Sequence, residues 1–304
     1  MSAKSSHVSV AIVTKDRHLD LIHCFGSLMC QTEQIDELII IDNSEGDSTK
    51  GIVENFRKLT KFPVRYRRES RIGYPIVRNK ALKLAKYDWI AFIDDDCIAD
   101  QNWYYYIKKS IQESSDWAIL GDSKPHSVSV FSTVSHLLES YWKKKGTSRS
   151  GKITDLEILD TKNVAFNKKL LGIKKISFDE SRVNVNFGAS EDCDIGMKIQ
   201  KSGGSAKFDH NIIVHHKDPT NIVNYYQKLV KNIYSHVNYE HIWMQYRRQT
   251  IKKQQNKFLS YFFQFSKKNN LRAVIQVQVL FHALLSILIT KVTKFVLRKS
   301  EWYL

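Results

Sequence analysis

Short apolar runs recur through the N-terminal half of the chain, and segments with a different spacing separate them. The runs are VSVAIV at 8–13, ELIII at 37–41, WIAFI at 89–93 and WAILG at 117–121. Between them, apolar residues follow helical spacing at 19–31, 50–60 and 76–87. Short strands that alternate with helices form βαβ units, in which helices bury both faces of a parallel sheet. The alternation therefore predicts an α/β fold with a mostly parallel sheet flanked by helices.

The pattern changes at about residue 221. Before it, NVAFNKKLL at 163–171 and AKFDHNIIVHHKD at 206–218 are typical of strands, and a helical segment lies between them. After it, the spacing is helical, and lysines and aromatic residues are frequent. We expect an α/β domain over residues 1–220 and a basic helical extension over residues 221–304. The polar, basic segment at 143–155 (KKKGTSRSGKITD) predicts a mobile loop.

Positive charge is concentrated in the extension. The chain has a formal net charge of +16, and from Gln227 onward 14 lysines and arginines face two acids, Glu240 and Glu301. These charges flank residues 273–290, which contain no Lys, Arg, Asp or Glu. Polar residues within that segment suit hydrocarbon poorly, while its apolar residues form one face at helical spacing. We expect a helix that lies on an anionic membrane surface without crossing it; a core helix or a contact between copies of the chain is the alternative.

Three adjacent carboxylates, Asp94, Asp95 and Asp96, follow the apolar run at 89–93. Ligands of open parallel sheets bind outside the carboxyl ends of the strands. Neighbouring carboxylates repel each other when both are ionised, unless a cation neutralises their charge. Mg²⁺ and Mn²⁺ prefer carboxylate and phosphate oxygens as ligands. The cluster therefore indicates a divalent metal held together with a diphosphate. By spacing alone, a solvated turn after the strand is equally compatible.

Carboxylates also open the helical segment within GASEDCDIGMKIQKSGG at 188–204. The helix dipole favours an ionised group at this position, and a general base has to be held close to the hydroxyl that it deprotonates. Asp192 is therefore a candidate base, with Glu191 beside it. Ser190 followed by acids is also an ordinary helix N-cap, and the two interpretations are compatible.

Four motifs in order resemble a family 2 glycosyltransferase of the GT-A fold, and the resemblance covers about residues 7–220. The motifs are VSVAIVTKDR at 8–17, ELIIIDNSEGDST at 37–49, RIGYPIVRNKALKLAKYDWIAFIDDDC at 71–97 and GASEDCDIGMKIQKSGG at 188–204. The third is the most specific, because it is similar to a glycine, an Arg-Asn-x-Ala stretch and an Asp-x-Asp in the family's order. The resemblance implies a Rossmann-like sheet that binds a nucleotide-sugar.

The same resemblance implies a role for each matching position. Asp94 and Asp96 match the metal-binding carboxylates, with Asp96 as the direct ligand, and Asp95 is placed to reach the ribose. The other nucleotide-sugar-binding positions are Thr14 and Arg17 in the first turn, Asp42 and Asn43 in the turn that reads the base, and Arg78 facing the nucleotide. Asp192 matches the catalytic base and Glu191 its neighbour, and His215 completes the metal or diphosphate site.

These roles imply an inverting transfer of a sugar from a nucleotide-diphosphate donor to a hydroxyl of a glycan or lipid-linked acceptor, with Mg²⁺ or Mn²⁺. A sugar-1-phosphate nucleotidyltransferase is an alternative, but the turn TKDRHLD at 14–20 lacks the glycines that such enzymes need. A non-catalytic nucleic-acid-binding protein is a second alternative. We prefer an anionic membrane surface as the partner of the basic extension, so we expect the protein to bind no nucleic acid. The four cysteines form no C-x-x-C pair, which fits a reducing cytoplasm. We expect a cytoplasmic protein, peripheral on the inner face of the plasma membrane.

Overall fold

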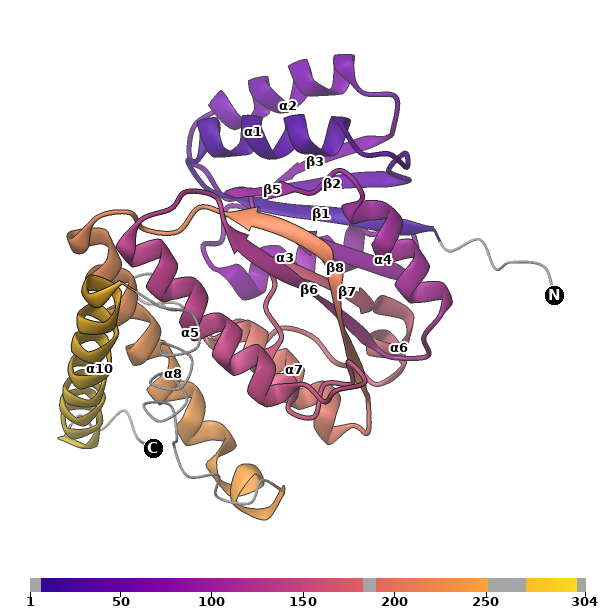
Figure 1. Ribbon diagram of the computed structural model, residues 1–304. Helices are drawn as coiled ribbons and strands as arrows, with labels where there is room; N and C mark the ends of the chain where they lie inside the picture. The colour runs from indigo at the N-terminus through magenta and orange to yellow at the C-terminus, as the bar shows by residue number, and fades with distance from the viewer. Residues whose placement is uncertain (1–6, 183–189, 251–271, 300–304) are drawn as a thin grey trace. The chain divides into compact units, whose positions relative to one another are not determined.

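The computed structural model describes residues 7–182, 190–250 and 272–299, and these form two compact units (Figure 1). Unit 1 takes in the chain up to residue 126 together with 142–183 and 191–217. Unit 2 takes in residues 127–141, 184–190 and the chain from residue 218 onward. The predicted site residues of the α/β sheet all belong to unit 1, so each unit is described separately below.

Unit 1 is built on an eight-stranded sheet with the order β3-β2-β1-β4-β7-β6-β8-β5. The neighbours β3, β2, β1 and β4 are parallel, whereas β7 runs antiparallel to both β4 and β6. The prediction of a mostly parallel sheet is confirmed. The strands are β1 (Val8–Thr14), β2 (Glu37–Asp42), β3 (Val64–Arg68), β4 (Trp89–Ile93), β5 (Cys97–Ala99), β6 (Ala118–Pro125), β7 (Asn163–Asn167) and β8 (Ala206–His216).

Successive strand residues point to opposite faces of this sheet, and both sets are apolar. Helices therefore cover both faces. Val10 and Ile12 of β1 face one apolar cluster and Ala11 faces the other. The first cluster is covered by α1 (His18–Met29), α2 (Ser48–Leu59) and α4 (Trp103–Gln112). The second is covered by α3 (Tyr74–Leu84), the 3-10 turn η1 (Leu156–Ile158), α6 (Lys168–Ile173) and α7 (Glu191–Lys201).

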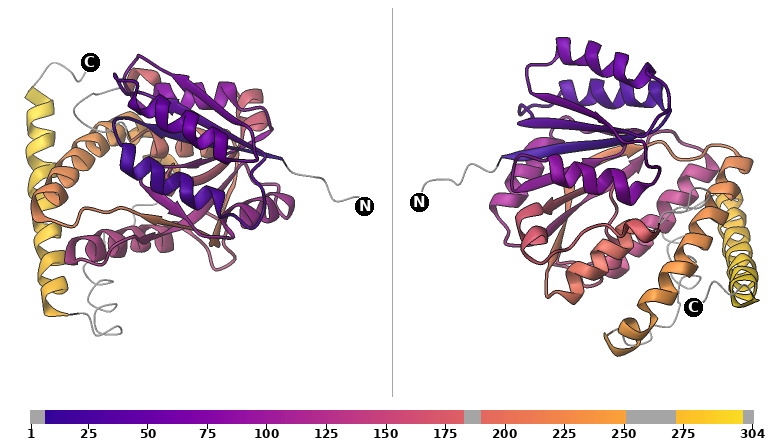
Figure 2. Two further views of the ribbon diagram at one scale, coloured as in Figure 1. Left: turned by 90° about the horizontal axis from the view of Figure 1, so that it is seen from above. Right: turned by 180° about the vertical axis from the view of Figure 1, so that it is seen from behind.

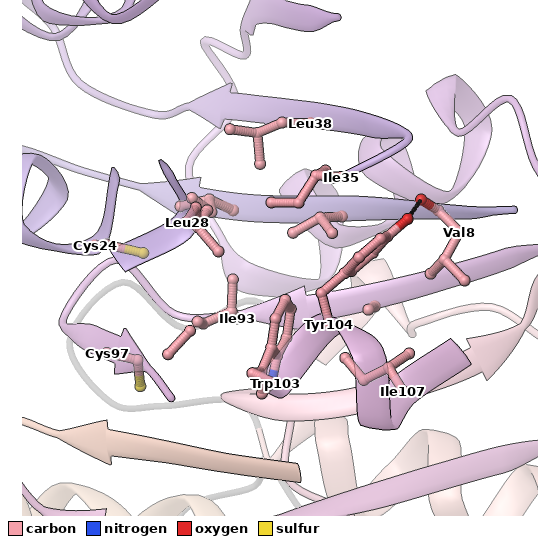
Figure 3. Packing of buried hydrophobic residues seen from close by; sticks show 14 of the residues in the cluster. Val8, Cys24, Leu28, Ile35, Leu38, Ile93, Cys97, Trp103, Tyr104 and Ile107 are labelled. Carbon is pink, nitrogen blue, oxygen red and sulfur yellow. Dashed lines mark hydrogen bonds between the residues drawn. The ribbon is translucent and has the colours of Figure 1, made fainter. Parts of the chain in front are cut away.

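The aromatic residues that open α4 belong to the first cluster (Figure 3). Trp103 and Tyr104 are fully buried, and the Tyr104 hydroxyl donates a hydrogen bond to the Val8 carbonyl oxygen at 3.0 Å. The Trp103 indole N–H donates to Asn163 Oδ1 at 2.8 Å. These two aromatic side chains therefore pack the core and tie α4 to β1 and β7.

The segment at 143–155 differs from the predicted loop. Its first residues continue α5 (Val130–Gly146), and Lys143 is buried with its Nζ 3.4 Å from Asp122 Oδ1. The rest folds back through a bridge between Thr147 and Ile153, and the Ile153 side chain is buried. The prediction of a loop was wrong for residues 143–146, which are helical, whereas the mobility of the residues that follow stays a prediction. Backbone hydrogen bonds from Ile153 to Ala206 and from Phe208 to Gly151 attach this segment to β8.

Unit 2 contains two long helices, α8 (Ile222–Thr250) and α10 (Ala273–Lys299), which lie side by side (Figure 2). Val279 of α10 and Tyr225 of α8 share a small apolar cluster with Val134 of α5. Residues Ala273–Phe295 of α10 are long and apolar enough to cross a membrane, with a mean hydropathy of 2.0 and little of the helix buried. This criterion concerns length and composition only, so the predicted surface position of the helix stays a prediction.

Candidate active site

The ends of several strands bring the predicted site residues of unit 1 to one edge of the sheet. Thr14 pairs with Asp42 at the carboxyl ends of β1 and β2. β4 runs parallel to β1, so the aspartates that follow Ile93 lie at the same edge. Antiparallel β7 begins there, because Asn163 pairs with Ile93. This edge is the one at which open α/β sheets bind their ligands.

Asp95 is buried at the centre of this edge. The Thr14 hydroxyl donates to Asp95 Oδ2 at 2.7 Å, and Arg17 Nη1 lies 3.2 Å from Asp95 Oδ1. Burial raises the pKa of Asp95 to about 7, although Arg17 and Thr14 favour the charged form. Asp95 thus contacts both Thr14 and Arg17, as expected of one site.

Asp96 faces two nitrogen-bearing side chains. Arg17 Nη2 lies 2.7 Å from Asp96 Oδ2, and His216 Nε2 lies 3.5 Å from the same oxygen. His216 is brought there because it pairs with Cys97 across β8 and β5. His215 points to the other side of β8, where burial, Lys124 and His126 lower its pKa. The geometry therefore places His216, rather than His215, beside the aspartates.

Arg78 connects the aspartates to the Glu-Asp motif. It is buried on α3, with Nη2 3.6 Å from Asp94 Oδ1, and Nη1 donates a hydrogen bond to Glu191 Oε1. Its Nε is buried and has no hydrogen-bond partner among the residues that the structure describes. An unpaired buried donor is costly, so this nitrogen is suited to an anionic ligand.

The two acids of the motif have different surroundings. Glu191 is buried and engaged by Arg78, whereas Asp192 is partly exposed and accepts a hydrogen bond from the Cys193 N–H at 2.8 Å. Burial raises the pKa of Asp192, and the carboxylate of Asp160 raises it further, while Arg78 acts in the opposite direction. A raised pKa makes a carboxylate a stronger base, and Asp192 is the more exposed of the two acids. Ser190, the N-cap candidate, instead shares a hydrogen bond with Ser235.

The turn after β2 is held by its own side chains. Asp42 is fully buried, where it accepts hydrogen bonds from the Tyr66 hydroxyl at 2.7 Å and the Ser44 N–H at 2.8 Å. Burial and the Asp42 carboxylate together raise the pKa of Tyr66 to about 12. Asp42 therefore supports the turn that the sequence assigned to base recognition.

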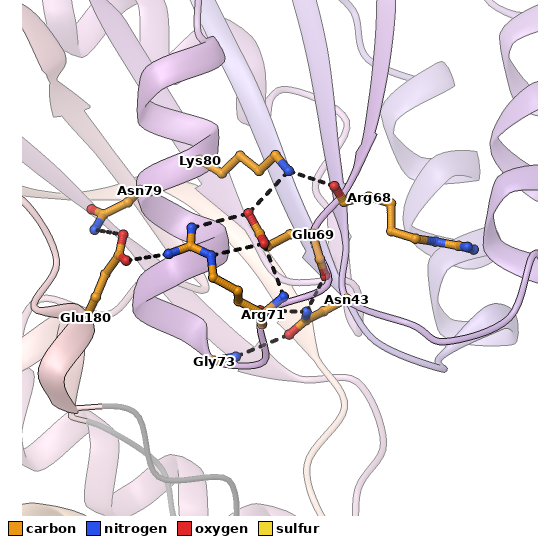
Figure 4. A network of polar contacts seen from close by, with 8 residues as sticks. All are labelled: Asn43, Arg68, Glu69, Arg71, Gly73, Asn79, Lys80 and Glu180. Carbon is orange, nitrogen blue, oxygen red and sulfur yellow. Dashed lines mark hydrogen bonds and ion pairs between the residues drawn. The ribbon is translucent and has the colours of Figure 1, made fainter.

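Asn43 organises the loop that leads into α3 (Figure 4). Its Nδ2 donates to the carbonyl oxygens of Glu69 at 2.6 Å and Arg71 at 3.0 Å, and its Oδ1 accepts from the Gly73 N–H at 3.2 Å. Gly73 has a φ of 144°, which residues with a Cβ rarely adopt. In this structure the Asn43 side chain shapes the loop, with both of its polar atoms engaged.

An ion-pair network that sequence reasoning missed braces the same loop (Figure 4). Arg71 bonds both Glu69 and Glu180, and Lys80 reaches Glu69 at 3.2 Å. Burial opposes the charge of Glu69, but hydrogen bonds from Arg71 and Lys80 outweigh it and lower the pKa to about 2. The alternating charges of RRESR at 67–71 are the sequence signal for such a network, although its partner Glu180 is distant in sequence.

We expect Asn43→Ala to lower the free energy of unfolding by roughly 1–3 kcal/mol, because buried backbone groups lose their partners. Urea unfolding of the purified protein measures this change. Glu45→Ala, at an exposed position in the same turn, is the control and should be neutral. Equal unfolding midpoints for the two variants would show that the Asn43 hydrogen bonds do not hold the loop.

The donor atoms at the sheet edge fit a divalent metal that is shared with a ligand. The described residues contain no group of three or more His, Cys, Asp or Glu side chains arranged to hold a metal ion. Three possible ligands are nevertheless present at this edge. The Asp94 side chain is 30% exposed, and Asp96 and His216 lie close to each other. Mg²⁺ commonly takes one or two carboxylates and completes its coordination with water and substrate phosphates.

A sheet with this topology defines the GT-A class of glycosyltransferase folds, and solved structures of that class resemble it. A mannosyltransferase from Pyrobaculum calidifontis in complex with GDP-Man and Mn²⁺ aligns with a TM-score of 0.64 at 14% identity, covering 96% of this chain and 74% of its own. S. aureus TarS in complex with UDP aligns with a TM-score of 0.55 at 16% identity, covering 83% and 74%. The sequence model for glycosyl transferase family 2 matches residues 9–171, and the chain belongs to this family.

Curated relatives agree with this assignment. A hyaluronan synthase of Pasteurella multocida is 26% identical over 244 residues, which are 70% of this chain and 24% of the relative. A chondroitin synthase of Pasteurella multocida (strain Pm70) is 24% identical over 249 residues, which are 71% of this chain and 25% of the relative. The chain therefore spans about a quarter of the length of these two proteins.

Proposed function

We propose that the chain transfers a sugar from a nucleotide-diphosphate donor to a hydroxyl of a glycan or lipid-linked acceptor, with inversion and with Mg²⁺ or Mn²⁺. The observation that supports this most is the position of Arg78, between Asp94 and Glu191. It joins the donor-binding edge of the sheet to the start of the helix that carries Asp192. Membership of the family favours sugar transfer over nucleotidyl transfer.

The side chains divide the reaction between them. Asp192 accepts the proton of the acceptor hydroxyl, and the resulting oxygen attacks the anomeric carbon from the face opposite the diphosphate. The new glycosidic bond forms as the bond from that carbon to the diphosphate oxygen breaks, so the configuration inverts. Arg78 donates hydrogen bonds to the donor's phosphate oxygens, and Asp94 and Asp96, with His216, would hold the metal. When bound, the metal supplies positive charge that stabilises the leaving diphosphate.

A screen of nucleotide-sugars for hydrolysis in the presence of Mn²⁺ tests the proposal most directly. We expect release of one nucleoside diphosphate, faster with the correct acceptor and lost in EDTA. The Asp88→Asn variant, exposed at the far end of β4, should behave as the wild type. If the protein neither binds nor hydrolyses any common nucleotide-sugar, the proposed function is wrong.

We further propose that α10 attaches the protein to an anionic membrane surface. Its exposed residues Val277, Phe281, Leu284 and Leu288 follow helical spacing on one side. Another side is held to α8 by polar contacts: Gln278 Nε2 donates to the Tyr226 hydroxyl at 2.6 Å, and Tyr225 and His282 share a hydrogen bond. A crossing helix would have to carry these polar groups into hydrocarbon, so a position in the interface is favoured.

Two charge substitutions on the exposed side test this proposal. We expect Phe281→Glu with Leu284→Glu to abolish co-sedimentation with vesicles of phosphatidylglycerol and phosphatidylethanolamine, while donor hydrolysis is unchanged. Val128→Glu changes a highly exposed apolar residue outside α10 and is the matched control. If the double variant still binds vesicles, the membrane proposal is wrong. If it instead loses a dimer that the wild type forms in gel filtration, the exposed side is a contact between copies of the chain.

A further inference from the structure

Lys162 lies at the same edge of the sheet as the aspartates, although it is far from them in sequence. β4 and β7 pair antiparallel, with Phe92 opposite Val164 and Ile93 opposite Asn163. Asp94 and Lys162 are the next residues beyond this last pair, one just after the end of β4 and the other just before the start of β7. Lys162 therefore lies at the ligand-binding edge of the sheet, next to the residue that pairs with Ile93.

The two strands that lead to Asp94 and Lys162 pack against the helix of the candidate base. Phe92 and Val164 belong to the apolar cluster that Ile195 of α7 and Val77 of α3 also join. The helices that carry Asp192 and Arg78 therefore cover one face of β4 and β7, close to the strand ends where Asp94 and Lys162 follow. Consistent with this, Lys162 opposes the rise in the pKa of Asp192 that burial and Asp160 cause.

Acidic and basic side chains alternate along this edge. Lys162 forms an ion pair with Asp160, two residues earlier in the chain. On the next strand, β6, Asp122 lies close by, because its carbonyl oxygen accepts a hydrogen bond from Asn163 at 2.7 Å, and its carboxylate pairs with Lys143. The Lys162 side chain is only 12% exposed, so most of it is shielded from bulk solvent.

We propose that Lys162 binds the diphosphate of the donor, exchanging its ion pair with Asp160 for a phosphate oxygen when the donor enters. The inference rests on the proposed function, which places that diphosphate beside Asp94. A largely buried lysine at the same edge as Asp94 can reach an anion held there, and a charge-assisted hydrogen bond to phosphate is a strong interaction. Asp160 then keeps the lysine in position before the donor arrives and competes with the donor for it.

This competition makes the two residues act with opposite signs. Lys162→Met removes the ammonium but keeps the length of the side chain, so we expect binding of nucleoside diphosphate to weaken by roughly 10- to 100-fold. Asp160→Asn removes the competing charge, so we expect binding to tighten severalfold. In the double variant the effect of Asp160→Asn should vanish, because the ammonium that it released is absent. If the ion pair between Lys162 and Asp160 only stabilised the fold, either single substitution would weaken binding.

Isothermal titration of UDP, GDP, CDP and ADP with Mn²⁺ present measures these changes, and the matching nucleosides report on the base and ribose alone. Lys169→Met is the matched control, since it removes the same charge from an exposed position on α6. We expect the control to bind as the wild type does, and nucleoside affinity to be the same in all variants.

The inference is overturned if Lys162→Met binds the nucleoside diphosphate as tightly as the wild type, or if Asp160→Asn weakens binding. If Lys162→Met does not fold, tighter binding by Asp160→Asn still supports the inference and weaker binding still overturns it. If the wild type binds none of the four nucleoside diphosphates, the proposed function itself is wrong and this inference falls with it. If the wild type binds a nucleoside diphosphate and Lys162→Met binds it equally well, only the role of the lysine is overturned and the proposed function stands.

Discussion

Replacing Asp192 by asparagine is expected to lower kcat by about 100-fold or more, the scale on which enzymes lose a general base. The asparagine keeps the shape of the side chain and can still accept the hydrogen bond from Cys193, so the start of α7 should be preserved. Affinity for the donor should change little, because Asp192 serves the acceptor. Initial rates and donor titration on the same preparation separate the two effects.

Glu191→Gln is the informative comparison for this variant. Glu191 is held by Arg78 and is buried, so its loss should disturb donor binding more than turnover. If Asp192→Asn abolished donor binding while Glu191→Gln lowered only kcat, the two roles would be exchanged.

The activity should also depend on pH through Asp192. Burial and the neighbouring Asp160 raise its pKa, so the carboxylate takes up a proton at a higher pH than an ordinary aspartate does. A base is active only when deprotonated, and activity is therefore expected to fall as the pH decreases through this raised value. The acid limb of kcat/KM should lie above the usual aspartate pKa of about 3.9.

Asp96→Ala should nearly abolish transfer and remove the Mn²⁺ dependence of nucleotide binding. The substitution deletes the carboxylate that both Arg17 and His216 contact, and with it the metal ligand of the proposed site. Metal ions contribute several kcal/mol of charge stabilisation in such reactions, so the loss should be severe. Titration of nucleoside diphosphate with and without Mn²⁺ measures it.

Asp96→Asn separates charge from shape, because it retains an oxygen that Arg17 can contact but is a weaker metal ligand. We expect it to lie between the wild type and Asp96→Ala. Turnover of the wild type that is unaffected by EDTA would contradict the metal proposal. Near-normal turnover of Asp96→Ala would contradict it independently.

The alternation of strands and helices was predictable because it is written in local periodicity, and the GT-A fold follows the same order of elements. The position of Asp94 to Asp96 at a strand's carboxyl end was predictable for the same reason, as was the start of a helix near Asp192. Helix and strand periods reflect which side chains must be buried, and that information lies within a few neighbouring residues. The motifs that carry the family resemblance lie on these locally determined elements.

The neighbours of each site residue were decided only by the tertiary structure. His216 and not His215 lies beside Asp96 because of the pairing of β8 with β5, and a register irregularity between Gly121 and Asp122 precedes that pairing. Lys162 comes to the edge that carries Asp94 only because β7 enters the sheet antiparallel, between β4 and β6. Side-chain direction in a strand reverses with every residue, so a register set by distant strands determines which groups meet. No local pattern records that register.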